Sequence, residues 1–590
     1  MVYKEFNIVF KTLWQHLSER RKKQFWIALI LMIIAMLVEV VSIGAVLPFL
    51  GILTAPEYVY QHSLMQPLIN YLEITSADQL TLPLTFIFII AAFIAGSIRM
   101  LILFVMTRLS FATGADLSID IYRRTLYQEY MVHMTRNSSA VINGVIGKTG
   151  VVIGKVISPF LKLISSIILV IGIMIALFTI NIIVALSSFV GFGLLYFMVA
   201  SYTKRRLSDN SKIIAEESTQ MIKSLQEGLG GIRDVLIDGS QEFYCKLYQS
   251  ADAPFRRASG DNQFISGSPR YIMEVIGMTL IAILAYQMTQ NEDSANTAIP
   301  ILGALAVGAQ RMLPALQQVY VSWSAIKSSI SSLKDVLDLL EQPLPCHFNQ
   351  GPITPTQFNK EIKLQNISFR YTKNTPWILE DINLSIPRGA RVGFIGPTGS
   401  GKSTVLDIIM GLLPPTKGSL IIDQRRFNIK NIREWQTNIA HVPQQIYLSD
   451  ASIEENIAFG IPKEKIDHNR VMDCARKAQI LDLIIGWKDG FQTNVGEMGA
   501  RLSGGQKQRI GIARALYKKA NILIFDEATS SLDNKTEKLV IDAINEIQGS
   551  VTVLMIAHRL STLQECDIII ELDNGNIKQQ GTPAEIIQNK

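Results

Sequence analysis

The chain has 590 residues, of which 48% are hydrophobic and 18% are charged, and its formal net charge is +6. Its mean hydropathy of +0.25 averages over two different halves, because residues 1–340 hold long apolar runs and residues 360–590 have the composition of a soluble domain. These properties exclude a single soluble domain, and because the basic residues lie beside the apolar runs, they favour a membrane protein with basic loops over a nucleic-acid-binding protein.

The apolar half contains six runs that are long enough to cross a bilayer, which takes about 20 residues. They are residues 25–52, 83–106, 157–180, 182–203, 271–290 and 297–322. We therefore predict a transmembrane domain at 1–340, a linker at 341–360 and a soluble domain at 361–590.

The charges of the loops predict the orientation of these spans. Lysine and arginine precede the first span and follow the second and fourth, whereas the loops 54–82 and 291–296 carry acids but neither lysine nor arginine. Basic loops favour the cytoplasmic side. We expect a multi-pass protein of the plasma membrane, in a bacterium the inner membrane, with both termini in the cytoplasm.

Two long polar segments, 107–156 and 204–268, are predicted to be helices that continue the spans into the cytosol. Within them, residues 122–139 and 230–244 are either short helices that dock on the soluble domain or plain amphipathic connectors. The outer loop 54–82 has apolar residues at helical spacing, so it is either an amphipathic helix at the membrane surface or a compact, self-packed loop.

The soluble half begins with a phosphate-binding loop between an apolar strand, "RVGFIG", and a helix. The loop fits G-x-x-x-x-G-K-[ST] and comprises Gly396, Pro397, Thr398, Gly399, Ser400, Gly401, Lys402 and Ser403, followed by Thr404. Glycines let backbone N–H groups surround phosphate oxygens, and the helix N-terminus adds partial positive charge. Lys402 is expected to contact the β- and γ-phosphates, and the Ser403 hydroxyl to ligate Mg²⁺.

Two further strands end in residues suited to phosphate chemistry. The stretch "ANILIFDE" ends in Asp526, which can hold Mg²⁺ through water, and Glu527, which can polarise the attacking water. His558 follows the strand "VTVLMIA", which we predict to be parallel to the other two, so that the histidine lies near the γ-phosphate.

A second phosphate-binding arrangement opens the helical stretch "QKQRIGIARAL". A serine and two glycines at a helix start can bind phosphate, and the segment comprises Leu502, Ser503, Gly504, Gly505 and Gln506. Two such elements in one chain suggest a nucleotide sandwiched between two chains.

These motifs, in this order, resemble the nucleotide-binding domain of ATP-binding cassette (ABC) proteins. With six spans ahead of it, the whole chain resembles an ABC exporter half-transporter with type IV-like fused domains. The resemblance implies an all-α transmembrane domain of six helices, fused to an α/β P-loop domain. It also implies ATP and Mg²⁺ as cofactors and a homodimer with two ATP sites.

The resemblance also implies roles for single residues. Tyr371 stacks on adenine, Gln444 in "HVPQQ" senses Mg²⁺ and touches the membrane domain, Glu527 is the general base and His558 is the switch histidine. Glu497 belongs to a segment that communicates with coupling helices, and Asp533 lies at the dimer contact. Residues 230–244 and the outer loop further resemble PglK-type flippases of lipid-linked oligosaccharides.

The cargo must be inferred from charges in the membrane half. Arg99 and Arg311 lie deep in predicted spans and Arg270 lies near a cytoplasmic end, although an arginine in a membrane is costly. These candidate cargo-binding residues suit an anionic cargo, such as the phosphate head of a lipid-linked glycan. The alternative is that Glu39 or Glu274 pairs with an arginine, or that these side chains extend to the interface.

The predicted function is therefore ATP-driven export or flipping of an anionic, lipid-linked glycan. An exporter of peptides, lipids or drugs shares every soluble motif and is the main alternative. A non-transport ATPase acting on DNA or ribosomes would lack the spans, and a receptor with a vestigial ATPase is disfavoured by the intact Lys402, Glu527 and His558.

Overall fold

The computed structural model describes residues 2–54, 56–63, 65–180, 182–289, 295–345, 348, 355–428, 431–527, 537–539, 551–556 and 563–587. The chain divides into two compact units. The first comprises Met1–Gln128 with Arg136–Leu344, and the second comprises Glu129–Thr135 with Pro345–Lys590. The division after Leu344 falls inside the segment predicted to be a linker.

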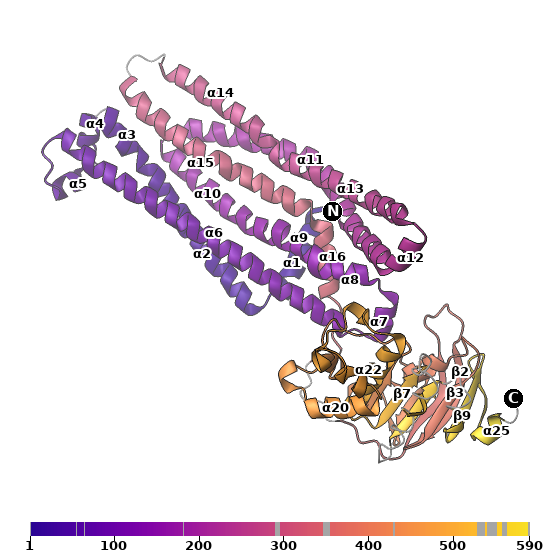
Figure 1. Ribbon diagram of the computed structural model, residues 1–590. Helices are drawn as coiled ribbons and strands as arrows, with labels where there is room; N and C mark the ends of the chain where they lie inside the picture. The colour runs from indigo at the N-terminus through magenta and orange to yellow at the C-terminus, as the bar shows by residue number, and fades with distance from the viewer. Residues whose placement is uncertain are drawn as a thin grey trace. The chain divides into compact units, whose positions relative to one another are not determined.

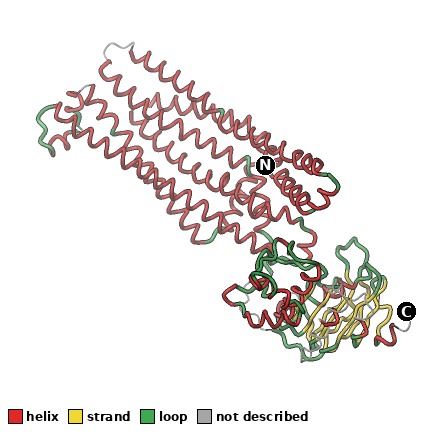
Figure 2. The backbone as a smooth tube through the Cα atoms, in the orientation of Figure 1, coloured by secondary structure: helices red, strands yellow, loops and turns green. Residues whose placement is uncertain are grey.

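The first unit is helical (Figures 1 and 2). Its helices are α1 (Val2–His16), α2 (Glu19–Gly44), α3 (Val46–Thr54), α4 (Pro56–Gln61), α5 (Gln66–Tyr71), α6 (Thr81–Leu126), α8 (Ser138–Ile142), α9 (Thr149–Val152), α10 (Ser158–Ile180), α11 (Ile182–Gly230), α12 (Ile232–Ile237), α13 (Gln241–Gly267), α14 (Pro269–Thr289), α15 (Ala295–Lys327) and α16 (Ile330–Leu340). The helix α10 packs on α2 and α15, and α2 packs on α6.

Three helical stretches within the described residues are long and apolar enough to cross a membrane. They are Glu19–Leu53, Ala77–Leu126 and Ser138–Ala176. The first two contain the predicted spans 25–52 and 83–106, and the third covers residues 157–176 of the predicted span 157–180. The other three predicted spans fall in α11, α14 and α15, where many side chains lie outside the description. The fold class is confirmed, and the number of six membrane-spanning helices stays a prediction.

The predicted helical extensions are confirmed by α6 and α11, which continue as far as Leu126 and Gly230. The outer loop forms the short helices α4 and α5, and its Val59 and Ile69 are buried against residues of α3 and α6. This packing supports the self-packed loop rather than the membrane-surface helix.

One short helix from the membrane half of the sequence belongs to the second unit. The helix α7 (Tyr130–Thr135) is part of that unit, and Met131 packs against its hydrophobic core. Docking of this segment on the soluble domain is thereby confirmed. The second predicted docking segment forms α12 within the first unit, where Leu236 and Ile237 are exposed.

The second unit contains two sheets (Figure 2). A four-stranded antiparallel sheet has the order β2-β1-β4-β5, formed by β1 (Glu361–Phe369), β2 (Leu379–Pro387), β4 (Lys417–Ile422) and β5 (Arg425–Arg426). A six-stranded sheet has the order β10-β9-β3-β8-β7-β6, formed by β3 (Arg391–Ile395), β6 (Ile439–Val442), β7 (Ile522–Asp526), β8 (Thr552–Ile556), β9 (Ile568–Asp573) and β10 (Asn576–Gly581).

The strands β3, β8 and β7 are consecutive neighbours and mutually parallel, as the sequence predicted. They are nearly continuous runs of buried apolar residues, which is typical of parallel strands covered on both faces. Besides α7, the described α-helices of this unit are α17 (Lys402–Ile409), α18 (Ile432–Gln436), α19 (Ile453–Ile457), α20 (His468–Lys477), α21 (Leu481–Ile485), α22 (Gly504–Tyr517) and α25 (Pro583–Ile587).

Candidate nucleotide-binding site

The predicted phosphate-binding residues follow neighbouring parallel strands. The loop from Gly396 follows β3, Asp526 ends β7, and Gln444 lies two residues beyond β6. In open α/β sheets, ligands bind beyond the carboxyl ends of the strands. The topology therefore gathers these residues at one edge of the sheet, whereas His558 and Asp533 lie outside the described residues.

The loop that connects β3 and α17 needs glycine at defined positions. Gly396, Gly399 and Gly401 have φ values of +141°, +83° and +99°. A Cβ atom on Gly396 would lie 2.1 Å from the Leu572 carbonyl oxygen, whereas one on Gly399 would meet open space. The close approach of the loop to the backbone of β9 therefore requires glycine at 396 for steric reasons.

One buried hydroxyl in the phosphate-binding loop lacks a hydrogen-bond partner in the described part of the chain. The Ser400 side chain is 2% exposed, and its hydroxyl finds no hydrogen-bond partner among the described residues. A buried hydroxyl without a partner is costly. A phosphate oxygen would satisfy it, so the loop fits the nucleotide that its pattern predicts.

Lys402 lies within the same loop. Its Nζ donates hydrogen bonds to the carbonyl oxygens of Gly396 at 2.9 Å and Pro397 at 2.8 Å. Burial lowers the pKa of its amine, while the carboxylates of Glu527 and Asp526 act in the opposite direction. These contacts hold the amine beside the backbone that is predicted to surround the phosphates.

The candidate water-activating and metal-binding residues form two hydrogen-bonded pairs, Ser403 with Asp526 and Gln444 with Glu527. Burial and the neighbouring Glu527 raise the pKa of Asp526, and a hydrogen bond with the Ser403 side chain lowers it. The Gln444 Nε2 atom donates a 2.8 Å hydrogen bond to Glu527 Oε2. Glu527 has a φ of +49°, a conformation that non-glycine residues adopt rarely and that often marks functional sites.

These side chains fit Mg²⁺ by their chemistry. Ser403 offers a hydroxyl, Asp526 a carboxylate and Gln444 an amide oxygen, and Mg²⁺ is a hard cation that prefers oxygen ligands and retains several waters. Within the described part of the chain, no three His, Cys, Asp or Glu side chains form a metal cluster. The hydroxyl, carboxylate and amide oxygens of these residues suit an Mg²⁺ ion that is bound together with the phosphates of a nucleotide.

Tyr371 is the candidate adenine-stacking residue. Its ring is partly buried against the core of the unit and lies edge-on to Phe369, with centroids 5.1 Å apart. This contact fixes the ring at the end of β1, as a stacking platform requires.

The LSGGQ segment caps the helix α22. The Ser503 hydroxyl accepts a hydrogen bond from the Gln506 backbone N–H at 3.3 Å, and the Gln506 side chain accepts one from the Ser503 N–H at 2.8 Å. This capping box fixes the helix start, while Ser503 and Gly504 remain exposed. Among the described residues, no hydrogen bond or ion pair links this segment to the loop that contains Lys402.

One titratable residue near the loop was missed by the sequence analysis. Asp407, on α17, has its pKa raised to about 6 by burial and by the charge of Asp526. Its charge in turn contributes to the raised pKa of Tyr130 on α7, for which burial is the larger cause. In the sequence, Asp407 is simply an acid in a helix, so no signal marked it.

Two of the three candidate cargo-binding arginines have carboxylate partners. The Arg99 Nε lies 3.5 Å from an oxygen of the buried Glu39, and the Arg270 Nε lies 2.6 Å from Glu274. These pairs support the internal-pairing alternative. Arg311 belongs to α15, and its side chain lies outside the description.

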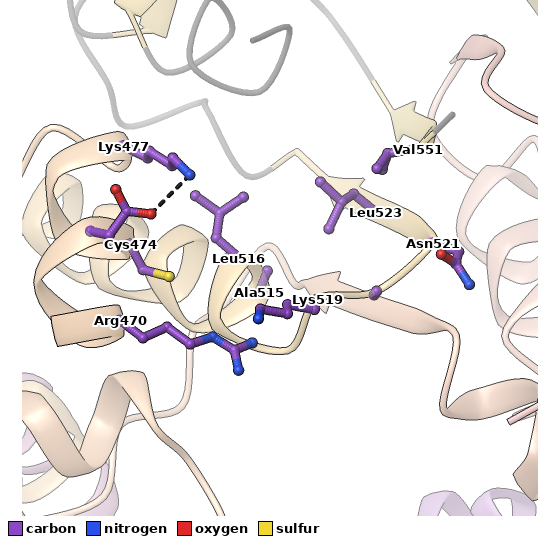
Figure 3. Close-up of a pocket in the computed structure, with 11 residues that line it drawn as sticks. Arg470, Cys474, Lys477, Ala515, Leu516, Lys519, Asn521, Leu523 and Val551 are labelled. Atoms are coloured by element: carbon purple, nitrogen blue, oxygen red, sulfur yellow. Dashed lines mark ion pairs between the residues drawn. The ribbon is translucent and has the colours of Figure 1, made fainter. Parts of the chain in front are cut away.

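A cavity of about 280 Å³ lies between α20, α22 and β7 (Figure 3). Two of its cations are already engaged, because Lys477 pairs with Asp473 at 2.9 Å and the Arg470 guanidinium lies 4.4 Å from the Tyr517 ring centroid. The cavity lining includes none of the described residues that the sequence assigned to nucleotide binding.

Comparison with known families gives two matches along the chain. The model described as "ABC transporter" matches residues 379–530, and the model described as "ABC transporter transmembrane region" matches residues 27–302.

Curated relatives match across both halves. An "ATP-dependent lipid A-core flippase" of Alkalilimnicola ehrlichii is 30% identical over 403 residues, which are 68% of this chain and 67% of the relative. One of Cupriavidus metallidurans, with the same description, is 26% identical over 82% of this chain and 81% of the relative. In fold, the chain is similar to a bacterial Atm1-family ABC exporter with ATP bound, with a TM-score of 0.77, 21% identity and 97% coverage of each chain.

Proposed function

The chain belongs to the ABC transporter family as an exporter half-transporter that couples ATP hydrolysis to transport across a membrane, and we propose that its cargo is an anionic, lipid-linked glycan. The observation that carries the proposal is that relatives aligned with up to four fifths of the chain are named lipid A-core flippases. A lipid-anchored cargo is moved by flipping its polar head across the bilayer, so a cation inside the membrane domain would favour an anionic head.

Arg311 is the main candidate for contact with that head. Arg99 and Arg270 already lie beside Glu39 and Glu274, so their charges are partly neutralised within the chain. In a dimer, Arg311 would be doubled by its copy in the partner, and Pro314 three residues later in α15 can kink the helix there.

We propose that two copies of the chain bind ATP between their nucleotide-binding domains. Lys402 and Glu527 of one copy and Ser503 and Gly505 of the other would contact each nucleotide. Ser403 and Gln444, with Asp526 acting through water, would hold Mg²⁺, which would neutralise charge on the phosphates of the nucleotide. Glu527 would accept a proton from the attacking water, and its positive φ and its hydrogen bond with Gln444 orient its carboxylate.

ATP then drives transport through its preference for the closed dimer. A ligand shifts a conformational equilibrium only by its differential affinity for the two states. Closure would bring the α7 helices of the two copies together and open the spans outward. We propose that both termini lie in the cytoplasm, because the loop charges all agree, and that the membrane is the plasma membrane, in a bacterium the inner membrane.

The proposal is tested by flipping in proteoliposomes that contain the full-length protein and a fluorescent, pyrophosphate-linked lipid oligosaccharide. We expect Arg311→Ala to lose flipping by about tenfold or more while basal ATP turnover is retained. Lys155→Ala, which removes an exposed cation just before the third predicted span, is the matched control and should flip normally.

Normal flipping by Arg311→Ala would refute the role of that charge. Equal transport of an uncharged lipid or a hydrophobic peptide by the wild type would favour the alternative, an exporter of peptides, lipids or drugs.

A further inference from the structure

A mainly apolar cavity of about 230 Å³ lies between α1, α6 and α10 in the first unit, whose helices can be followed in Figure 1. For comparison, an engineered apolar cavity of about 150 Å³ in another protein stays dry and binds benzene. Neither the nucleotide-binding residues nor the three candidate cargo arginines line it. It is therefore a separate feature of the membrane domain.

Aromatic side chains hold the walls of this cavity in place. The Phe10 and Phe160 rings lie 5.0 Å apart, and the Trp14 and Phe25 rings meet edge-on at 5.6 Å. The helix α1 is anchored by buried apolar residues, including Leu13, in a cluster shared with α6 and α16. The cavity is thus framed by fixed contacts.

The polar side chain of Thr113 lines the cavity. Thr113 on α6 is fully buried, and its hydroxyl finds no hydrogen-bond partner among the described residues. By contrast, the Ser110 hydroxyl on the same helix donates to the Met106 carbonyl at 2.8 Å. Because an unpaired buried hydroxyl is costly, Thr113 suits an occupant that brings a hydrogen-bond acceptor.

The residues around the cavity are typical of the interface between membrane and water. Phe25 begins the first apolar run, and the basic stretch 20–23 directly precedes it. Trp14 and Trp26 are 37% and 61% exposed, and tryptophan is enriched where bilayer and water meet. Lys11 is an exposed cation among the lining residues, and a basic side chain near a membrane surface attracts anionic lipids.

We propose that this cavity binds an acyl chain of an anionic membrane phospholipid. The chain would occupy the aromatic-lined space, the ester carbonyl would accept the Thr113 hydroxyl hydrogen bond, and the phosphate would lie beside Lys11. This lipid is a resident ligand rather than the transported cargo, so the inference does not rest on the proposed cargo.

The test uses the full-length protein in phosphatidylcholine nanodiscs, with added phosphatidylglycerol that carries a diazirine near the end of one acyl chain. After irradiation, peptide mapping should locate the label in residues 8–17 or 157–160. Thr113→Leu removes the hydroxyl and narrows the cavity, so it should lower this labelling about tenfold. Thr107→Leu makes the same change at an exposed position of α6 and should leave it unchanged.

Two further variants, Thr113→Val and Lys11→Glu, test the same proposal independently if Thr113→Leu does not fold. Thr113→Val preserves shape without the hydroxyl and should lower labelling about threefold. Lys11→Glu should lower labelling by phosphatidylglycerol but not by an equivalent phosphatidylcholine probe, with basal ATP turnover retained. Unchanged labelling in folded Thr113→Leu or Thr113→Val, or equal labelling by both lipids, would overturn the proposal.

Discussion

The Gln444 amide and the Glu527 carboxylate are joined by a 2.8 Å hydrogen bond that connects the ends of the adjacent parallel strands β6 and β7. The bond holds together the two residues to which the sequence assigned metal sensing and water activation. Because Glu527 also has a φ of +49°, both its backbone conformation and its side-chain contact orient the carboxylate.

The first prediction concerns the chemistry of Glu527. Glu527→Gln removes the proton acceptor but keeps the size of the side chain, so ATP turnover should fall by about 100-fold or more. ATP binding should persist, and the closed dimer should accumulate. Phosphate release and disulfide trapping of the dimer measure these effects.

Gln444→Ala serves as a comparison with Glu527→Gln. It removes the hydrogen bond to Glu527 but leaves the Glu527 carboxylate in place. Retained turnover in Glu527→Gln would refute its assignment as general base, whatever Gln444→Ala shows.

The second prediction compares two glycines of the phosphate-binding loop. In Gly396→Ala, the new Cβ would lie 2.1 Å from the Leu572 carbonyl oxygen, whereas in Gly399→Ala it would meet open space. Both positions have positive φ, so Gly399→Ala should cost about 1 kcal/mol in stability. Gly396→Ala should lose more stability and also ATP binding.

Thermal unfolding and binding of a fluorescent ATP analogue separate these two costs. If the two variants had the same melting temperature and the same affinity for the ATP analogue, the loop would be able to move away from Leu572.

The sequence predicted those parts of the site that depend on local order. Strand, glycine loop and helix follow one another along the chain, so the pattern that ends in Lys402 and Ser403 was sufficient to predict the β3–α17 unit. Short apolar runs that each end in a residue suited to phosphate chemistry likewise led to the prediction of three parallel strands, and the pairing of β3, β8 and β7 confirms it.

Other features depend on contacts between distant residues and left no local signal. The raised pKa of Asp407 arises from burial and from Asp526, which is 119 positions away. Equally, no pattern showed which acid would lie beside Arg99, although Glu39 was among the alternatives. The sequence left two interpretations open for residues 122–139, which include 129–135. A short amphipathic helix can dock on the soluble domain, or it can simply connect two longer helices.

The third prediction decides the role of Arg99. Glu39 is 3% exposed and lies 3.5 Å from Arg99, so Arg99→Gln should destabilise the protein by about 1–3 kcal/mol by weakening support for a buried carboxylate. The double variant Arg99→Gln with Glu39→Gln should recover most of this loss.

Melting temperature and flipping are measured together for these variants. If flipping recovers with stability in the double variant, Arg99 acts through its pairing with Glu39. A stable double variant that no longer flips would instead support direct contact between Arg99 and the cargo.

The last prediction concerns pH. The folded pKa of Asp407 is about 6, above its ordinary value of 3.8, so between these values the folded protein binds more protons than the unfolded chain. The protonated Asp407 carboxyl therefore makes its whole contribution to the free energy of unfolding below about pH 4. This contribution is lost as the pH rises through 6.

Asp407→Asn mimics the protonated carboxyl at every pH. It should raise the melting temperature of the full-length protein at pH 7.5, equivalent to about 1 kcal/mol because Asp407 is only partly buried and solvent screens its charge. The gain should be smaller at pH 5. Asp482→Asn, at an exposed position of α21, is the control and should change little at either pH. A gain from Asp407→Asn that stays constant between pH 5 and 8 would contradict titration of this group and would point to a packing effect of the amide instead.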